Sequence, residues 1–179
     1  MTPERYRRLL HWLEVHPACK QIVIVLNRWL PAVPFVCYPV LLMLLNVRLA
    51  RMFSTGPSDA ALNFMQQIAR AVFVPAFVFL GGTLLRAKLN FPRPYEQPGF
   101  TPLMEKETTG KAFPSRHALS ASVLAAVWLY FYRVAGVCMS VVALLICVLR
   151  VVAGVHSVRD VAAGAALGFL LGIVGMWLM

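Results

Sequence analysis

Arg86 and Arg93 form the first of three short clusters whose side chains suit phosphate chemistry in this sequence of 179 residues. Six residues separate the two arginines, and Pro94 follows the second. Guanidinium groups stay charged at any physiological pH and bind phosphate through paired hydrogen bonds. The pair therefore fits a phosphate site, although two arginines beside an apolar segment also fit a plain anchor at the membrane edge.

The second cluster, Ser115, Arg116 and His117, directly precedes an apolar segment. We predict that Ser115 caps a helix, whose free amide groups then form a site for an anion. His117 would stand beside that anion, where it can donate a proton to a leaving oxygen. The alternative is an inert helix cap followed by an interfacial histidine.

The third cluster is Arg150, then five residues, His156, three residues and Asp160. If His156 and Asp160 share a helix they lie on one face, so Asp160 accepts from one ring nitrogen and leaves the other as a nucleophile of fixed tautomer. On a continuous helix Arg150 would point away from His156. We therefore expect Gly154 to break the helix and let both reach one phosphate. The alternative is a buried arginine paired with a carbonyl or with Asp160.

The composition places these clusters in a membrane protein. Hydrophobic residues make up 60% of the chain and charged residues 13%, and the mean hydropathy is +0.72. We predict an all-α integral membrane bundle of five to six transmembrane helices in a single domain, because each crossing takes about 20 residues. The net charge of +10 is spread between apolar segments. This pattern favours membrane lipids as partners and excludes nucleic acid.

The N-terminal segment, residues 1–31, differs from the membrane-embedded domain, residues 32–179. It is predicted to form an amphipathic interfacial helix capped by Thr2 and stopped by Pro17. Residues 22–26 are too few to cross and are interpreted as interfacial or re-entrant. Between later spans, the proline-rich stretch 91–114 is expected to be a loop with no helix. The expected spans cover residues 29–47, 64–85, 118–132, 134–155 and 161–179.

A tight hairpin at Gly136 would return His117 and His156 to the same membrane face, since they lie nearly equal numbers of residues before and after it. The last span carries a stripe of small residues at every fourth position, which is expected to pack inward. The alternative use of this stripe is a homodimer interface. The stripe consists of Asp160, Gly164, Gly168 and Gly172.

In this order and spacing, residues 86 to 160 resemble the signature of the type 2 phosphatidic acid phosphatases. That family's pattern is Lys, six residues, Arg-Pro; then Pro-Ser-Gly-His; then Ser-Arg, five residues, His, three residues, Asp. This sequence departs from it at Arg86 in place of Lys, Arg116 in place of Gly and Leu149 in place of Ser. The departures keep both histidines and the aspartate, so we expect activity with an altered substrate preference.

The resemblance implies metal-independent hydrolysis of a lipid phosphate or pyrophosphate monoester through a phosphohistidine, with no cofactor. His156 would be the nucleophile, Asp160 its partner and His117 the acid. The substrate would be a phospholipid or isoprenoid phosphate, such as undecaprenyl pyrophosphate, phosphatidylglycerol phosphate or phosphatidate. The phosphate-binding residues would be Arg86, Arg93, Ser115, Arg116 and Arg150.

Two other functions fit the same residues. One is transfer of the phosphoryl group to a second lipid instead of water. The other is a non-catalytic membrane protein that binds or transports lipids and uses Arg70 and Arg150 as charges within the membrane. Arg48, Arg51 and Arg133 lie on the face opposite the clusters, so the positive-inside rule predicts a site at the extracytoplasmic face of the cytoplasmic membrane.

Overall fold

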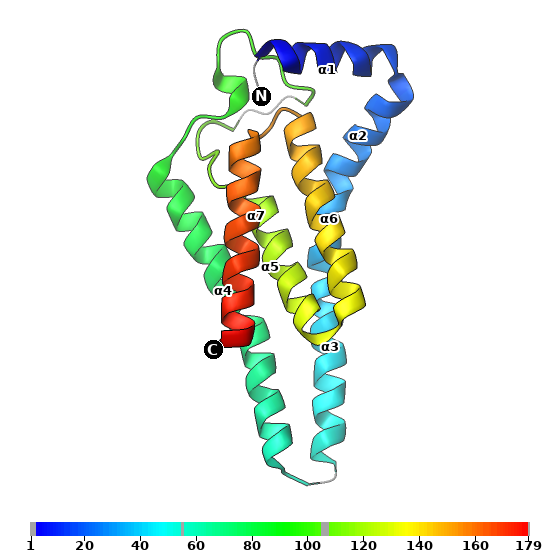
Figure 1. Ribbon diagram of the computed structural model, residues 1–179, viewed down its shortest axis with the longest axis vertical. Coiled ribbons are helices and arrows are strands. Elements are labelled where there is room, and N and C mark those ends of the chain that lie inside the picture. Colours follow the sequence, from blue (N-terminus) through cyan, green and yellow to red (C-terminus); the bar gives the residue numbers. More distant parts are fainter. Residues whose placement is uncertain (1–2, 55, 105–107, 179) are drawn as a thin grey trace.

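The computed structural model describes residues 3–54, 56–104 and 108–178, and its regular elements in these ranges are all helices (Figure 1). The predicted all-α class is confirmed. The expected cap at Thr2 lies outside the described residues. The long helices are α1 Pro3–Val15, α2 Pro17–Trp29, α3 Val33–Phe53, α4 Asp59–Leu89, α5 Arg116–Phe131, α6 Arg133–Val152 and α7 Val158–Ile173. Shorter pieces are η1 Leu30–Ala32, η2 Pro94–Glu96 and the π-helical η3 Val174–Leu178.

The N-terminal part consists of two helices at an angle. α1 ends just before Pro17, which occupies the first turn of α2, where its missing amide proton costs nothing. The predicted helix and its end are thus present, and α1 lies across one end of the bundle (Figure 1). α2 runs on through η1 into α3 without reversing direction, so the re-entrant interpretation of residues 22–26 is wrong. The helical turn at η1 accommodates Pro31 without stopping the chain.

α5 is the central helix of the bundle. Every residue from Ala118 to Trp128 is buried, and α3, α4, α6 and α7 all contact it. The outer helices instead expose large apolar side chains, such as Phe77 at 69% and Val134 at 81%, as lipid-facing helices do. Among the residues that the structure describes, four stretches are long and apolar enough to span a membrane: Pro17–Phe53, Asp59–Glu96, Arg133–Val152 and Val158–Leu178. With 16 residues α5 is shorter, so the count of five to six spans stays a prediction.

Glycines allow α5 to approach α6 and α7 closely. α5 and α6 form the expected tight hairpin, in which a side chain at Gly136 would collide with the backbone of Leu129. On α7, Gly164 and Gly168 lie against the α5 backbone at Ser115 and Leu119. The predicted inward packing of the stripe is therefore confirmed, and its alternative use as a dimer interface is wrong because α5 already occupies it.

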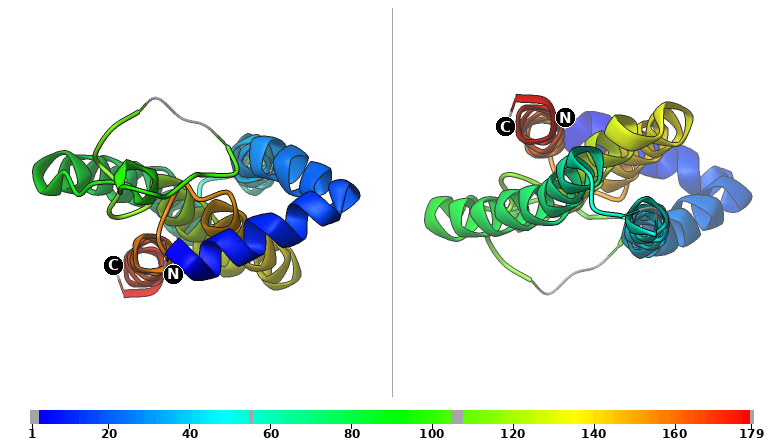
Figure 2. Two further views of the ribbon diagram at one scale, coloured as in Figure 1. Left: turned by 90° about the horizontal axis from the view of Figure 1, so that it is seen from above. Right: turned by 90° about the horizontal axis from the view of Figure 1, so that it is seen from below.

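The bundle has two distinct ends. The α3–α4 connection and the α5–α6 turn point to one end (Figure 1). α1, the loop between α4 and α5 and the α6–α7 turn gather at the other end, and Figure 2 shows α1 running over this end from above. Because the three clusters lie at the end of α4, the start of α5 and the α6–α7 turn, the fold brings them to one end.

Candidate active site

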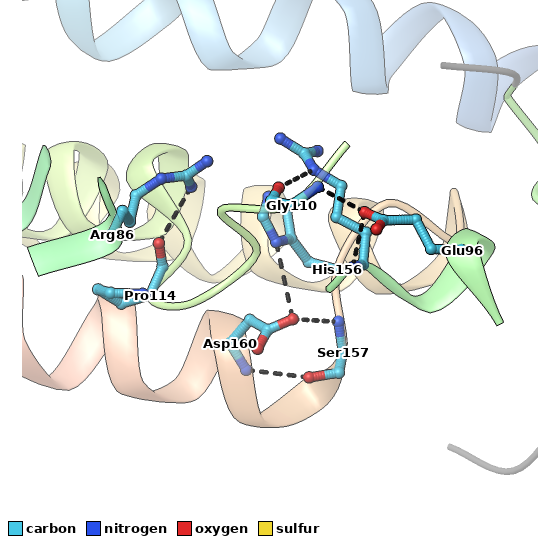
Figure 3. A network of polar contacts seen from close by, with 8 residues as sticks. Arg86, Glu96, Gly110, Pro114, His156, Ser157 and Asp160 are labelled. Carbon is cyan, nitrogen blue, oxygen red and sulfur yellow. Dashed lines mark hydrogen bonds and ion pairs between the residues drawn. The ribbon is translucent and has the colours of Figure 1, made fainter. Parts of the chain in front are cut away.

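Arg86 reaches the site from the last turn of α4. Its side chain is buried, and its guanidinium donates a 3.1 Å hydrogen bond to the carbonyl of Pro114, directly before Ser115 (Figure 3). Lys88, two residues further on, is exposed. The cation that contacts the second cluster is therefore Arg86.

The loop presents Arg93 through a small network closed by Glu96. The Arg93 Nε donates to the carbonyl of Gly110 at 3.0 Å. One carboxylate oxygen of Glu96 accepts from the backbone amides of Arg93 at 3.0 Å and Gly110 at 2.6 Å. The single 3-10 turn at Pro94–Glu96 corrects the expectation of a loop without any helix. It forms because the Glu96 side chain reaches back to the turn's first amide.

Ser115 occupies the N-cap position of α5, as predicted, but its hydroxyl does not cap the helix. The hydroxyl oxygen is buried and has no hydrogen-bond partner among the described residues. Its amide instead donates a 2.9 Å bond to the carbonyl of Asp160 at the start of α7. The hydroxyl thus remains open to a ligand at the start of α5.

The α6–α7 turn folds His156 back over Arg150. α6 ends at Val152, and Gly154 adopts a φ of +74°, in the region that favours glycine. The amides of Val155 and His156 then donate to the Arg150 carbonyl at 3.2 and 3.3 Å. The predicted break at Gly154 is confirmed, and it removes the separation that a continuous helix would impose on Arg150 and His156.

His156 and Asp160 do not share a helix, because α7 begins only at Val158. Their closest atoms, Nδ1 and Oδ2, are 3.8 Å apart, an ion-pair separation too long for a hydrogen bond (Figure 3). The Asp160 carboxylate accepts from the Ser157 amide at 2.8 Å, while its own amide donates to the Ser157 hydroxyl at 3.2 Å. This reciprocal cap fixes the carboxylate beside the imidazole, which corrects the predicted helical pairing.

The electrostatic surroundings keep His156 neutral. Burial lowers the pKa of His156 below its ordinary 6.5, and the positive charge of Arg93 lowers it further. Asp160 acts in the opposite direction but is outweighed. A neutral imidazole at physiological pH has a free electron pair, which a nucleophile requires. The same Arg93 charge also acts on Arg86 and Arg150, so cations from all three segments lie within electrostatic reach of one another.

A polar cavity of about 500 Å³ opens beside Arg86 and Arg93. Arg116, the first residue of α5, is exposed and lines it, and His117 follows directly and is half-buried. Lys111 and two loop threonines also face the cavity. Its walls are therefore cationic and rich in hydrogen-bond donors, which suits an anionic ligand.

Five buried side-chain polar atoms lack hydrogen-bond partners among the described residues, and three of them belong to the predicted clusters. These three are the Ser115 hydroxyl, the Arg150 Nε and the His156 Nδ1. Buried polar atoms are normally paired, and leaving one unpaired costs about 1–3 kcal/mol. The His156 Nδ1 faces Asp160 at 3.8 Å, so the Ser115 hydroxyl and the Arg150 Nε are the two groups of this set that are open to a polar ligand. The structure thus brings together the three predicted clusters.

Two features of the site were missed by the sequence analysis. Glu96 holds Arg93 and Gly110, and the charge of Arg159 lies 5.0 and 5.2 Å from the rings of Phe91 and Phe113. Arg159 therefore ties both ends of the loop to the start of α7. Only the capping-box spacing from Arg93 to Glu96 offered a signal in the sequence.

The sequence and the fold are similar to those of known proteins. Residues 67–179 match the family model described as the PAP2 superfamily. The fold is similar to the crystal structure of LpxE from Aquifex aeolicus, with a TM-score of 0.54 and 22% identity over 87% of this chain and 92% of that one. A transmembrane PAP2-type phosphatidylglycerolphosphate phosphatase from Bacillus subtilis gives a TM-score of 0.49 and 23% identity, over 95% of this chain and 90% of the other. A search of the curated proteins found no significant match.

Proposed function

Because this chain belongs to the PAP2 superfamily, we propose that it hydrolyses the phosphate or pyrophosphate ester of a lipid at the membrane surface. One observation carries this proposal: the buried Ser115 hydroxyl and Arg150 Nε, which have no partner among the described residues, lie at the same end of the bundle as the His156 imidazole, on which the charges of Arg86 and Arg93 act. Such a site can surround one phosphoryl group with positive charge and place a neutral imidazole against it.

The proposed reaction has two steps. The free ring nitrogen of His156 attacks phosphorus, a phosphohistidine forms, and the bond to the leaving oxygen breaks while His117 gives that oxygen a proton. Water then attacks the phosphohistidine, His117 takes a proton from it, and phosphate leaves with His156 restored. Asp160, held by Ser157, orients the imidazole and stabilises it while it carries positive charge.

The cations do most of the stabilisation in this proposal. Phosphoryl transfer spreads negative charge over the three equatorial oxygens, so binding groups aimed at them lower the barrier. Five residues would hold these oxygens, and with so much positive charge the mechanism needs no divalent metal. They are Arg86, Arg93, Arg150, the Ser115 hydroxyl and the amide of Arg116.

A lipid substrate follows from the position of the site. The cluster stands at the end of apolar helices whose outer surfaces suit lipid, so a substrate anchored in the bilayer can present its phosphate there. Phosphatidate, phosphatidylglycerol phosphate and undecaprenyl pyrophosphate all have this form. The cationic cavity beside the cluster has room for a second anionic group, which favours the last two.

The two alternatives are weighed by specific contacts. Transfer to a lipid alcohol uses the same phosphohistidine, and product analysis distinguishes it from hydrolysis. The transport alternative needs Arg70 as a charge along a path, but its guanidinium donates to the carbonyl of Met176 at 3.3 Å, within η3. Arg70 thus stabilises the C-terminal end of the last helix, where a positive charge is favourable. We place the site at the extracytoplasmic face of the cytoplasmic membrane, following the basic residues of the opposite end.

The test is phosphate release from the three lipids in detergent with EDTA present. The parent is compared with His156→Ala and His117→Ala, and with His11→Ala, an exposed histidine on α1, as the matched control. We expect no release by His156→Ala, strongly reduced release by His117→Ala and parental release by His11→Ala. Full activity in His156→Ala would overturn the site, and loss of parental activity with EDTA would overturn the metal-free mechanism.

A further inference from the structure

Tyr6 of α1 lies far from the three clusters in sequence but contacts two of the segments that carry them. Its side chain is 1% exposed, and its ring stacks on Phe100 of the loop with centroids 4.4 Å apart and planes at 14°. The hydroxyl accepts a 3.0 Å hydrogen bond from the Leu103 amide and donates a 3.1 Å bond to the Val152 carbonyl. One side chain thus joins the loop to the α6–α7 turn.

The position of the hydroxyl explains a constraint on the turn. A Cβ at Gly154 would lie 2.5 Å from the Tyr6 hydroxyl oxygen and 3.1 Å from the Cα of Pro102. Gly154 therefore meets two requirements, a positive φ and close contact with Tyr6 and the loop. The turn that carries His156 over Arg150 is packed directly against this tyrosine.

We propose that Tyr6 is a positioning residue, which fixes the α6–α7 turn and the loop relative to each other and so sets the geometry of the phosphate site. The bond to Val152 acts on the last residue of α6, two positions after Arg150, and satisfies a carbonyl of the helix end. The bond to Leu103 and the stack on Phe100 act on the loop that presents Arg93. α1 thereby contributes to catalysis without touching the substrate.

Both hydrogen bonds are made by one oxygen atom, the Tyr6 hydroxyl, so a single substitution tests them together. Removing the hydroxyl alone would leave the ring stacked on Phe100 but would break the two hydrogen bonds that connect the loop to the end of α6. All residues of the phosphate site would then still be present, but the distance between the turn that carries His156 and the loop that presents Arg93 would no longer be fixed. An enzyme held within about 1 Å of its productive geometry is sensitive to such loosening.

The test compares Tyr6→Phe with Tyr38→Phe. Tyr38 is the matched control because its hydroxyl also donates to a backbone carbonyl, that of Ala71 at 2.9 Å, on α4 away from the site. The readouts are kcat and KM for phosphatidate, the inhibition constant of orthovanadate, which mimics the transferring phosphoryl group, and the Tm in detergent. Tyr6→Phe loses both hydrogen bonds of the hydroxyl, and because these act on the site only through the loop and the turn, we expect kcat/KM to fall about three- to tenfold. Tyr38→Phe should keep parental values.

Orthovanadate separates positioning from mere loss of folded protein. If Tyr6 sets the site geometry, the inhibition constant rises by the same factor as kcat/KM falls. If the variant is only partly folded, kcat falls while KM and the inhibition constant keep their parental values, and the proposal is overturned. Parental kinetics in Tyr6→Phe overturn it too.

This inference rests on the proposed function, and the two fail differently. If His156→Ala keeps full activity, the proposed site itself is wrong whatever Tyr6 does. If His156→Ala is inactive and Tyr6→Phe behaves like the parent, the site stands and only the role of Tyr6 is rejected.

Discussion

The amide of Ser115 donates a 2.9 Å hydrogen bond to the carbonyl of Asp160, which joins the first turn of α5 to the first turn of α7. The hydroxyl proposed to bind phosphate and the carboxylate behind His156 therefore sit on one rigid junction. Gly164 lies directly beneath it: a Cβ there would come 2.5 Å from the Ser115 carbonyl oxygen. The small-residue stripe thus supports the site as well as the packing of the two helices.

We predict that Gly164→Ala separates this junction. The added methyl group meets backbone atoms, which cannot rotate away, so the variant is expected to lose about 1–3 kcal/mol of folding free energy through overpacking. Phosphate release should fall as well, because Ser115 and Asp160 move apart. The measurements are Tm and kcat/KM in detergent. Gly81→Ala on α4 is the control, since nothing lies within 4 Å of a Cβ there; equal behaviour of the two variants would contradict the junction.

The low pKa of His156 predicts the pH dependence of the reaction. The neutral imidazole attacks, and burial keeps its pKa below 6.5, so activity persists at pH 6.5 and falls only as the pH drops through the lower folded-state value. In a plot of kcat/KM against pH, the acidic limb, where activity falls at low pH, is therefore expected below pH 6.5. An acidic limb above pH 6.5 would contradict a buried, neutral nucleophile.

Asp160→Asn tests the assignment of that limb. The carboxylate raises the pKa of His156, so its removal is expected to move the limb to still lower pH. The rate should fall by roughly 100-fold or more, as when the orienting carboxylate of a catalytic histidine is removed. Titration of the substrate phosphate is the same for both proteins, so a shift between them belongs to the enzyme. An unmoved limb would assign the titration to another group.

Glu96→Ala is expected to disorganise the loop without unfolding the bundle. Its carboxylate accepts from the amides of Arg93 and Gly110, and this pairing brings Gly110 to the Arg93 guanidinium. We expect kcat/KM to fall about tenfold, in the range for hydrogen bonds to a charged group, with an unchanged Tm. Glu96→Gln keeps an acceptor oxygen and should lose less. Equal losses in both variants would indicate a role for the charge itself.

The sequence predicted how the segments are arranged better than it predicted the local geometry. The spacing of the clusters, the small-residue stripe and the helix break at Gly154 are all local patterns, and the structure confirms them. The position of His156 outside α7 was not predicted. Ser157 caps the helix, so α7 begins only after it and His156 lies in the preceding turn. The contact of Tyr6 with Val152 was not predicted, since it spans nearly the whole chain and leaves no local signal.

Arg116→Gly, which restores the residue of the family pattern, is expected to change substrate preference. Arg116 is exposed and lines the cationic cavity, where it can pair with a second phosphate or an acidic headgroup. Exposed ion pairs contribute about 0.2–1 kcal/mol, so the ratio of kcat/KM for undecaprenyl pyrophosphate over that for phosphatidate should fall by about 1.5- to fivefold.

Lys88→Gln is the control, because Lys88 is an exposed cation of the same region outside the residues that line the cavity. The loss should shrink at high salt, since exposed charges are screened. A ratio that stays constant in Arg116→Gly, or falls equally in Lys88→Gln, would show that the arginine does not select the substrate.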